Sequence, residues 1–216
     1  MHRVKAAVKW TSYAAAKTAL GGLLVPYFRL SVRGREKIPR DGGLVFAANH
    51  FSFADPPLLG IAMPRRIWFV MSGEMFRKAT FYLFSRLMDV IPVAAGQPFQ
   101  TAAMRKILRV LKDGHCVGIF PEGQRSRTGQ LLPAQRGVGV FAQRAGVPVV
   151  PVAIAGTREA FPAGVWFPRP RKVRVFVGDP IPPFAGGTPD LLAEKVRGAI
   201  AALLQEHGCG DYVGEE

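Results

Sequence analysis

The chain has 216 residues and a formal net charge of +14, from 29 Lys and Arg residues against 15 Asp and Glu residues. This length fits one domain that buries a hydrophobic core without disulfides or metal ions. Only two cysteines are present, far apart in the sequence, which argues against a disulfide framework and against a cysteine metal site. The positive charge predicts an anionic partner: nucleic acid, an anionic membrane surface or a phosphorylated small molecule.

The distribution of charge and the motifs narrow this choice. Residues 1–40 contain many Lys and Arg residues and one acidic residue, Glu36. The sequence shows no aromatic RNP pattern, no zinc-finger spacing and no recognisable helix-turn-helix pattern. We therefore expect no nucleic-acid partner and favour a membrane surface with anionic lipids.

The N-terminal segment has the composition of a membrane-associating helix. Residues 5–30 mix lysines with leucine and aromatic side chains, and Lys17 interrupts the apolar run. Because a membrane-spanning helix needs about 20 apolar residues, the pattern favours an amphipathic helix that lies in the membrane interface, within residues 1–33. A core-packing helix with a solvated basic face and a signal peptide are the alternatives. We expect a peripheral or monotopic protein at the cytoplasmic face of the cell membrane.

Strand-like and helix-like segments alternate along the rest of the chain. Apolar runs predict strands at residues 44–49, 67–72, 89–93, 116–120, 147–155 and 172–178, and helical patterns cover residues 55–63, 75–87, 104–112, 137–145 and 188–208. Such alternation predicts an α/β fold whose sheet is covered by helices on both faces. We expect one domain over residues 34–208, followed by a frayed tail over residues 209–216.

His50 and Asp55 flank the turn between the first central strand and the following helix. Their spacing allows the carboxylate to hold one imidazole nitrogen while the other nitrogen takes a proton from a hydroxyl group, which is the arrangement of a general base. No protein nucleophile is required if the substrate attacked by that hydroxyl is already activated, as a thioester is, and the sequence lacks a G-x-S-x-G nucleophile elbow. A hydrogen-bonded histidine beside a helix-capping Asp is the structural alternative.

A second motif, residues 120–127, directly follows the strand at 116–120. An α/β sheet presents its ligand site beyond the ends of its strands, so this motif is expected to share an edge with His50. Arg125, Arg127 and Arg136 offer planar groups suited to phosphate oxygens, and Gly123 allows close approach of a ligand to the backbone. Glu122 could accept a hydrogen bond from a glycerol hydroxyl or hold an arginine. A solvated basic loop is the alternative.

The two blocks NHFSFAD and FPEGQRSR resemble the motifs of the glycerophospholipid acyltransferase family, in particular bacterial lysophosphatidic acid acyltransferases. The resemblance implies a mixed, largely parallel sheet and transfer of an acyl group from acyl-CoA or acyl carrier protein to a lysophospholipid acceptor. It also implies His50 as the base, Asp55 as its partner, and acceptor contacts from Glu122, Gly123 and Arg125. No metal ion and no organic cofactor is implied.

One block departs from the family pattern, because residues 89–95 lack the usual Gly and Arg. Arg136 or Lys106 could replace that arginine, or the acceptor could differ. Glycerol 3-phosphate, an amino-acid lipid and a glycolipid therefore remain alternative acceptors, and a non-catalytic basic membrane-binding protein remains an alternative of another class. Trp166 and Phe167 lie beside basic residues in a turn that could touch lipid headgroups or simply connect two strands.

Overall fold

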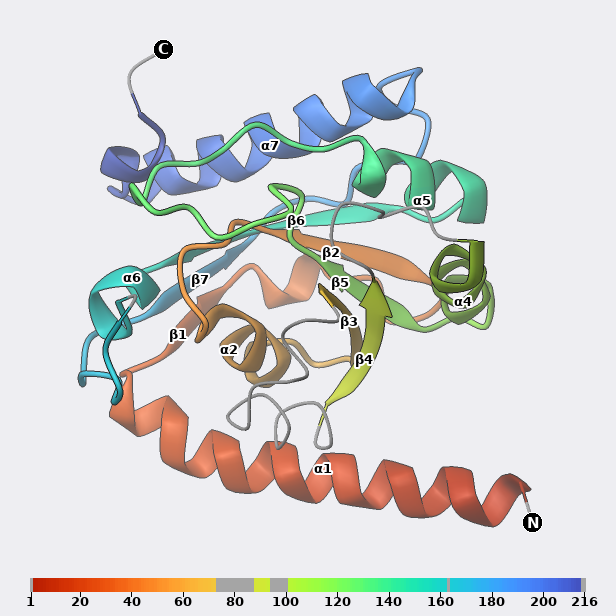
Figure 1. The fold of residues 1–216 in the computed structure, drawn as a ribbon, viewed down its shortest axis with the longest axis horizontal. Coiled ribbons are helices and arrows are strands. Elements are labelled where there is room, and N and C mark those ends of the chain that lie inside the picture. The colour runs from red at the N-terminus through yellow and green to blue at the C-terminus, as the bar shows by residue number, and fades with distance from the viewer. Residues whose placement is uncertain (1, 73–87, 94–100, 163, 215–216) are drawn as a thin grey trace.

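The computed structural model describes residues 2–72, 88–93, 101–162 and 164–214. They form an α/β domain around a seven-stranded sheet with strand order β1-β7-β6-β2-β5-β3-β4 (Figure 1). The strands are β1 (Ser31–Arg33), β2 (Leu44–Ala48), β3 (Ile67–Ser72), β4 (Asp89–Val93), β5 (Cys116–Ile119), β6 (Val149–Ala155) and β7 (Arg174–Val177). Paired strands run parallel except β6 and β7, which are antiparallel. The predicted mixed, largely parallel sheet is confirmed.

Helices cover both faces of this sheet, as expected. On one face lie α4 (Thr101–Lys112), α5 (Gly137–Ala145) and α7 (Pro189–Glu206), and on the other lie α1 (His2–Tyr27) and α2 (Asp55–Ala62) (Figure 1). Short helical turns occur at α6 (Thr157–Ala160), η1 (Arg35–Lys37) and η3 (Gly210–Tyr212). The central strands are therefore enclosed on both sides.

Strand β2 shows how the sequence specifies this arrangement. All five of its residues are buried, as expected for a continuous apolar run in a parallel sheet covered on both faces. Successive side chains of a strand point to opposite faces, and accordingly Val45 and Ala47 belong to the core cluster that includes α4, α5 and α7. Leu44, Phe46 and Ala48 belong to the cluster that includes α2. The two cores thus meet across β2.

The N-terminal helix α1 is attached to the body of the domain at several points. Tyr13 is buried, the Lys17 ammonium donates a hydrogen bond to the Met63 carbonyl, and Phe28, just beyond the helix, is 2% exposed. Burial lowers the pKa of Lys17, and the nearby Arg35 charge lowers it further. Within the described part of the chain, no helix has both the length and the apolar character needed to cross a membrane. The membrane-associating role of α1 stays a prediction.

The structure adds one strand to the expected elements and changes one expectation, and it leaves another untested. Strand β1 was not expected, and it pairs in parallel with β7 at one edge of the sheet. Residues 209–213 pack against the domain instead of fraying, because Cys209 is buried and the Tyr212 ring stacks on Phe51 with 5.1 Å between centroids. The helix expected at residues 75–87 lies outside the described residues.

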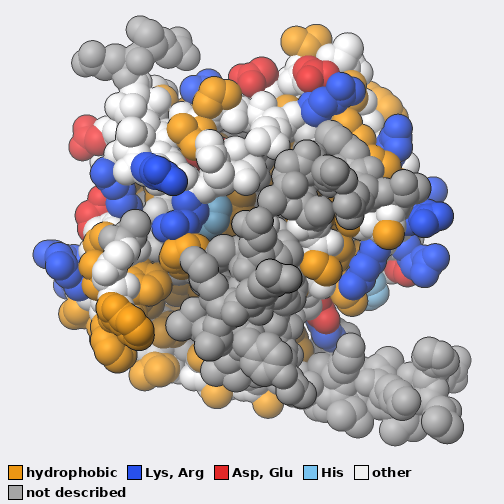
Figure 2. All heavy atoms as spheres, in the orientation of Figure 1, with side chains coloured by type: hydrophobic (Ala, Val, Ile, Leu, Met, Phe, Trp, Pro, Cys, Tyr) orange, Lys and Arg blue, Asp and Glu red, His pale blue; other side chains and the backbone are white. Residues whose placement is uncertain are grey.

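Basic side chains are also spread more widely than the N-terminal concentration in the sequence indicates. Lys and Arg side chains lie along both sides of the face drawn in Figure 2. The positive charge is therefore not confined to the N-terminal segment.

The side chain of Asn49 extends the pairing of β2 with β6 by one step. Its amide nitrogen donates to the Ile154 carbonyl at 2.8 Å, and its amide oxygen accepts from the Ile154 N–H at 2.7 Å. Asn49→Leu keeps the branched shape of the side chain but leaves both buried backbone groups unpaired, so we expect a loss of about 2–4 kcal/mol in the free energy of unfolding, measured with urea. Gln143→Leu, which removes a hydrogen bond to the Gly187 carbonyl near the surface, is the matched control. A cost for Asn49→Leu no larger than that of the control would contradict the prediction.

Candidate active site

The two sequence motifs meet at one edge of the sheet. Strands β2 and β5 are parallel neighbours in which Ala47 pairs with Ile119. The segments that follow them therefore leave the sheet side by side, beyond the carboxyl ends of the strands, which is where open α/β sheets place ligands. The shared edge expected for His50 and residues 120–127 is present.

His50 and Asp55 form a direct contact across the turn between β2 and α2. His50 Nδ1 lies 2.9 Å from Asp55 Oδ2, and the Asp55 side chain is fully buried. The same oxygen accepts the backbone N–H groups of Phe51 and Ser52, each at 2.7 Å. An ionised carboxylate only accepts hydrogen bonds, so Nδ1 carries the proton and Nε2 keeps its lone pair. This tautomer is the one that a general base requires.

The imidazole ring is held from a second side by Phe120. The two ring centroids lie 4.1 Å apart with an angle of 22° between the planes, so the rings are stacked. The His50 side chain remains 15% exposed. The contacts with Phe120 and Asp55 fix the plane of the imidazole while leaving part of it open to solvent.

Glu122 holds the backbone of the turn that carries His50. Its Oε1 accepts the N–H of His50 at 2.8 Å, and its Oε2 accepts the N–H of Leu132 at 3.1 Å. The side chain is buried, and burial raises the pKa of Glu122 to about 7 even though both hydrogen bonds act in the opposite direction. The sequence predicted a contact with the acceptor, whereas both carboxylate oxygens here have backbone partners.

Ser126 completes the connection between the two motifs. Its N–H donates to the His50 carbonyl at 2.9 Å, and its hydroxyl accepts the N–H of Gly129 at 3.0 Å. Both backbone polar groups of His50 are thus bonded to the second motif, the N–H through Glu122 and the carbonyl through Ser126. Neither link was found from the sequence, although both residues lie in the recognised block.

Gly123 allows the tight turn that directs these groups inward. Its φ of 70° lies in the left-handed region that favours glycine, and its N–H donates to the Phe120 carbonyl at 3.0 Å. A side chain here would also come within 2.3 Å of the Gln135 amide. The local backbone therefore requires glycine at position 123, independently of the ligand contact expected for it.

The arginines expected to bind phosphate occupy different places. Arg125 lies over the Phe53 ring, with 3.5 Å from its Cζ to the ring centroid, and is half-buried beside the His50–Asp55 turn. Burial lowers the pKa of its guanidinium, and the Asp55 carboxylate acts in the opposite direction. Arg127 is exposed. Arg136 lies at the start of α5, with its Nε 4.0 Å from Asp190 Oδ2.

In the departing block, Asp89 pairs with the guanidinium of Arg66, an arginine that was not singled out from the sequence. Residues 94–95 lie outside the described part of the chain, and the Lys106 ammonium lies 5.5 Å from the centroid of the Trp68 ring. Among the described residues, no group of three or more His, Cys, Asp or Glu side chains is placed to hold a metal ion.

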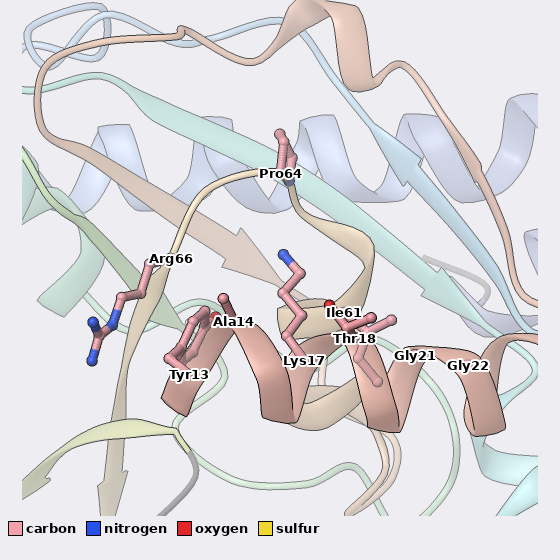
Figure 3. Close-up of a pocket in the computed structure, with 9 residues that line it drawn as sticks. All are labelled: Tyr13, Ala14, Lys17, Thr18, Gly21, Gly22, Ile61, Pro64 and Arg66. Carbon is pink, nitrogen blue, oxygen red and sulfur yellow. The ribbon is translucent and has the colours of Figure 1, made fainter. Parts of the chain in front are cut away.

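A separate cavity of about 370 Å³ lies between α1 and α2 (Figure 3). Tyr13, Lys17 and Gly21 line it from α1, and Ile61 and Arg66 line it from the body of the domain. His50 and Asp55 are not among its lining residues, so this cavity is distinct from the turn that carries them.

The family model described as Acyltransferase matches residues 29–155, which include both motifs. A chloroplastic 1-acyl-sn-glycerol-3-phosphate acyltransferase of Brassica napus is 30% identical over 184 residues, which cover 84% of this chain and 52% of that protein. The chain therefore spans about half the length of this plant relative. A 1-acyl-sn-glycerol-3-phosphate acyltransferase of Bacillus subtilis is 30% identical over 162 residues, covering 70% of this chain and 76% of that protein.

The fold also matches a solved structure. The crystal structure of the 1-acyl-sn-glycerophosphate acyltransferase from Thermotoga maritima superposes with a TM-score of 0.80 and 25% sequence identity, covering 94% of this chain and 83% of that chain.

The raised pKa of Glu122 makes a prediction about stability. Between pH 4.5 and about 7 the folded chain keeps a proton on Glu122 that the unfolded chain releases, so this group stabilises the fold below pH 4.5 and the contribution is lost as the pH rises through about 7. The shift corresponds to about 3 kcal/mol. We expect the free energy of unfolding of the wild type, relative to Glu122→Gln, to fall by that order across this window in urea titrations. Glu194→Gln controls for the loss of one solvated carboxylate, and a difference that does not change with pH would contradict the prediction.

Proposed function

Because the chain belongs to the acyltransferase family, we propose that it transfers a fatty acyl group from acyl-CoA or acyl carrier protein to the free hydroxyl of lysophosphatidic acid, giving phosphatidic acid. The observation that carries the proposal is the 2.9 Å contact between His50 Nδ1 and buried Asp55, which leaves Nε2 as a proton acceptor. The printed names of the relatives, 1-acyl-sn-glycerol-3-phosphate acyltransferases, support the choice of acceptor.

The proposed reaction needs no covalent intermediate on the protein. His50 Nε2 takes the proton from the acceptor hydroxyl as that oxygen attacks the thioester carbonyl and forms the new C–O bond. Asp55 stabilises the imidazolium that results. When the tetrahedral intermediate collapses, the C–S bond breaks, and the imidazolium returns its proton to the leaving sulfur. The products are a diacyl phospholipid and a free thiol, with His50 restored.

Arg125 is the arginine that we expect to bind the acceptor phosphate. It lies beside the catalytic turn, and its contact with Phe53 restricts the orientation of its planar guanidinium. A planar fork held in one orientation matches two phosphate oxygens, which places a neighbouring hydroxyl reproducibly. Arg127 is exposed and offers a weaker contribution, and Arg136 is partly engaged with Asp190.

We place the protein at the cytoplasmic face of the cell membrane as a peripheral or monotopic protein. Its proposed acceptor is a lipid, its net charge is +14, and no described helix can span a bilayer. A membrane surface with anionic lipids is therefore part of the proposal, together with the acyl donor and the lysophospholipid.

The catalytic pair can be tested directly. Removing the base by His50→Ala, or the negative charge of its partner by Asp55→Asn, is expected to lower the rate of acyl transfer by about 10²- to 10⁴-fold. The measurement is thiol release from palmitoyl-CoA with lysophosphatidic acid in mixed micelles, with the diacyl product confirmed by mass spectrometry. His115→Ala, an exposed histidine before β5, is the matched control.

The outcome separates mechanism from substrate. Full activity in a correctly folded His50→Ala protein would exclude the proposed mechanism. An inactive wild type with this substrate pair would exclude this acceptor or donor. Acyl carrier protein as the donor, and glycerol 3-phosphate or a glycolipid as the acceptor, are then compared in the same assay.

Phosphate recognition by Arg125 predicts a specific kinetic change. A charge-assisted hydrogen bond contributes about 1.5–3 kcal/mol, so Arg125→Gln is expected to raise the KM for lysophosphatidic acid by at least about tenfold. Arg125→Lys keeps the charge but loses the fork, and we expect an intermediate KM. Arg127→Gln and Arg136→Gln are expected to have smaller effects because both residues are exposed, and Arg105→Gln on α4 is the distant control. An unchanged acceptor KM in Arg125→Gln would overturn this role.

A further inference from the structure

An exposed aromatic loop, residues 164–172, leads from α6 towards β7. Trp166 is 89% exposed and Phe167 is 80% exposed, which is more than any other large apolar side chain in the described part of the chain. Neighbouring fully exposed aromatic side chains are unfavourable in water unless they contact something else. The loop therefore has the character of an interaction surface.

The loop is held in place against the end of α1. The Tyr27 hydroxyl donates to the Pro168 carbonyl at 2.7 Å, and the Arg169 N–H donates to the Ala160 carbonyl at 2.6 Å. Leu23, one turn before Tyr27 on α1, is 64% exposed. We define the docking surface as Leu23, Tyr27, Trp166 and Phe167. Figure 1 shows this loop meeting the C-terminal end of α1, and Figure 2 shows hydrophobic side chains grouped on that side of the molecule, next to basic ones.

Beside this surface lies a cationic cavity of about 670 Å³. Four basic side chains line it, namely Arg29, Arg169, Arg171 and Lys172. The acidic side chain in its lining, Glu159, accepts a hydrogen bond from the Tyr212 hydroxyl at 2.9 Å. The cavity thus has a strong excess of positive charge and donors, a composition that suits phosphate groups.

We propose that the docking surface inserts into the membrane interface and that the cationic cavity receives the phosphate headgroups of anionic lipids. Aromatic side chains prefer the headgroup level of a bilayer, and basic side chains beside them are attracted to anionic lipids. The exposed aromatic side chains and the basic cavity occur together here. This favours a lipid surface over a soluble anion, because a soluble anion would contact the basic side chains but not Trp166 and Phe167. The inference rests on the proposed function at a membrane and assigns the docking to a surface outside α1 alone.

This surface is connected to the catalytic turn. Tyr212 lines the cavity and stacks on Phe51, the residue after His50, and the Ser52 hydroxyl donates to the Phe161 carbonyl at 2.8 Å. A membrane bound at the docking surface therefore lies next to the segment that carries His50. The hydroxyl of a lysophospholipid would therefore reach His50 while its acyl chain stays close to the bilayer.

The test measures binding of the full chain to vesicles of equal parts phosphatidylglycerol and phosphatidylcholine, by sedimentation. Trp166→Ala/Phe167→Ala is expected to lower the partition coefficient by about tenfold or more, because two large apolar side chains no longer leave water. Phe184→Ala/Leu191→Ala, which removes two other exposed apolar side chains near the start of α7, is the matched control and is expected to bind like the wild type.

The charge component is tested separately. Arg169→Gln/Arg171→Gln/Lys172→Gln is expected to lose about fivefold per charge on the anionic vesicles and little on vesicles of phosphatidylcholine alone. The control Arg105→Gln/Lys112→Gln/Lys195→Gln removes the same charge from exposed positions on α4 and α7.

Each outcome decides between docking and its alternatives. Wild-type partitioning of both loop variants would overturn the proposal and leave any membrane binding to α1. A triple variant that binds vesicles normally but shows a raised KM for acyl-CoA would assign the cavity to the phosphates of the donor, which also overturns it. His50→Ala is expected to bind vesicles like the wild type, so the binding result is independent of whether the proposed acyl transfer is found.

Discussion

The backbone of His50 is bonded on both sides to the loop that follows β5, and the candidate site depends on this link. Glu122 accepts its N–H, and Ser126 donates to its carbonyl. Unpaired, these buried groups would cost a few kcal/mol, so the turn after β2 cannot move without breaking bonds to the second motif. Asp55 then meets His50 Nδ1 because the N–H groups of Phe51 and Ser52 hold the same carboxylate oxygen. The backbone bonds thus fix the position of His50, and the contacts with Asp55 and Phe120 fix the plane of its imidazole.

The order and direction of the strands place these groups at one edge of the sheet. With β2 in the centre, flanked by β5 and β6, the loops after two parallel strands emerge at one edge, and helix α2 starts at Asp55. The positive end of a helix favours a negative charge at that position, which suits a carboxylate that must remain beside the imidazole. Asn49 pairs with Ile154 at the same edge, so the last residue before His50 is anchored to β6 as well.

Local patterns in the sequence predicted the parts of this site that depend on neighbours along the chain. The spacing of His50 and Asp55 and the strands before each motif follow from apolar runs and turn residues, and they appear as expected. The direction of Glu122 could not be predicted, because a carboxylate in that loop can face a ligand or the backbone, and the N–H of distant Leu132 decides between them. Strand β1 is three residues long and has no periodicity to detect, while the tail is held by the non-local contact of Tyr212 with Phe51.

Non-local contacts also decide where the basic side chains gather, so the sequence did not predict the cationic cavity. The sequence draws attention to the basic N-terminal segment, yet folding brings Arg29, just after α1, to the same cavity as three basic residues of the aromatic loop. Grouped charge produces a local potential that scattered charge does not, and here the group adjoins side chains that water solvates poorly. The edge that carries His50 and Asp55 is joined through Phe51 and Tyr212 to the side that suits a lipid surface. A lipid acceptor needs both in one molecule, because its reacting hydroxyl lies only a few bonds from a headgroup that stays at the membrane surface.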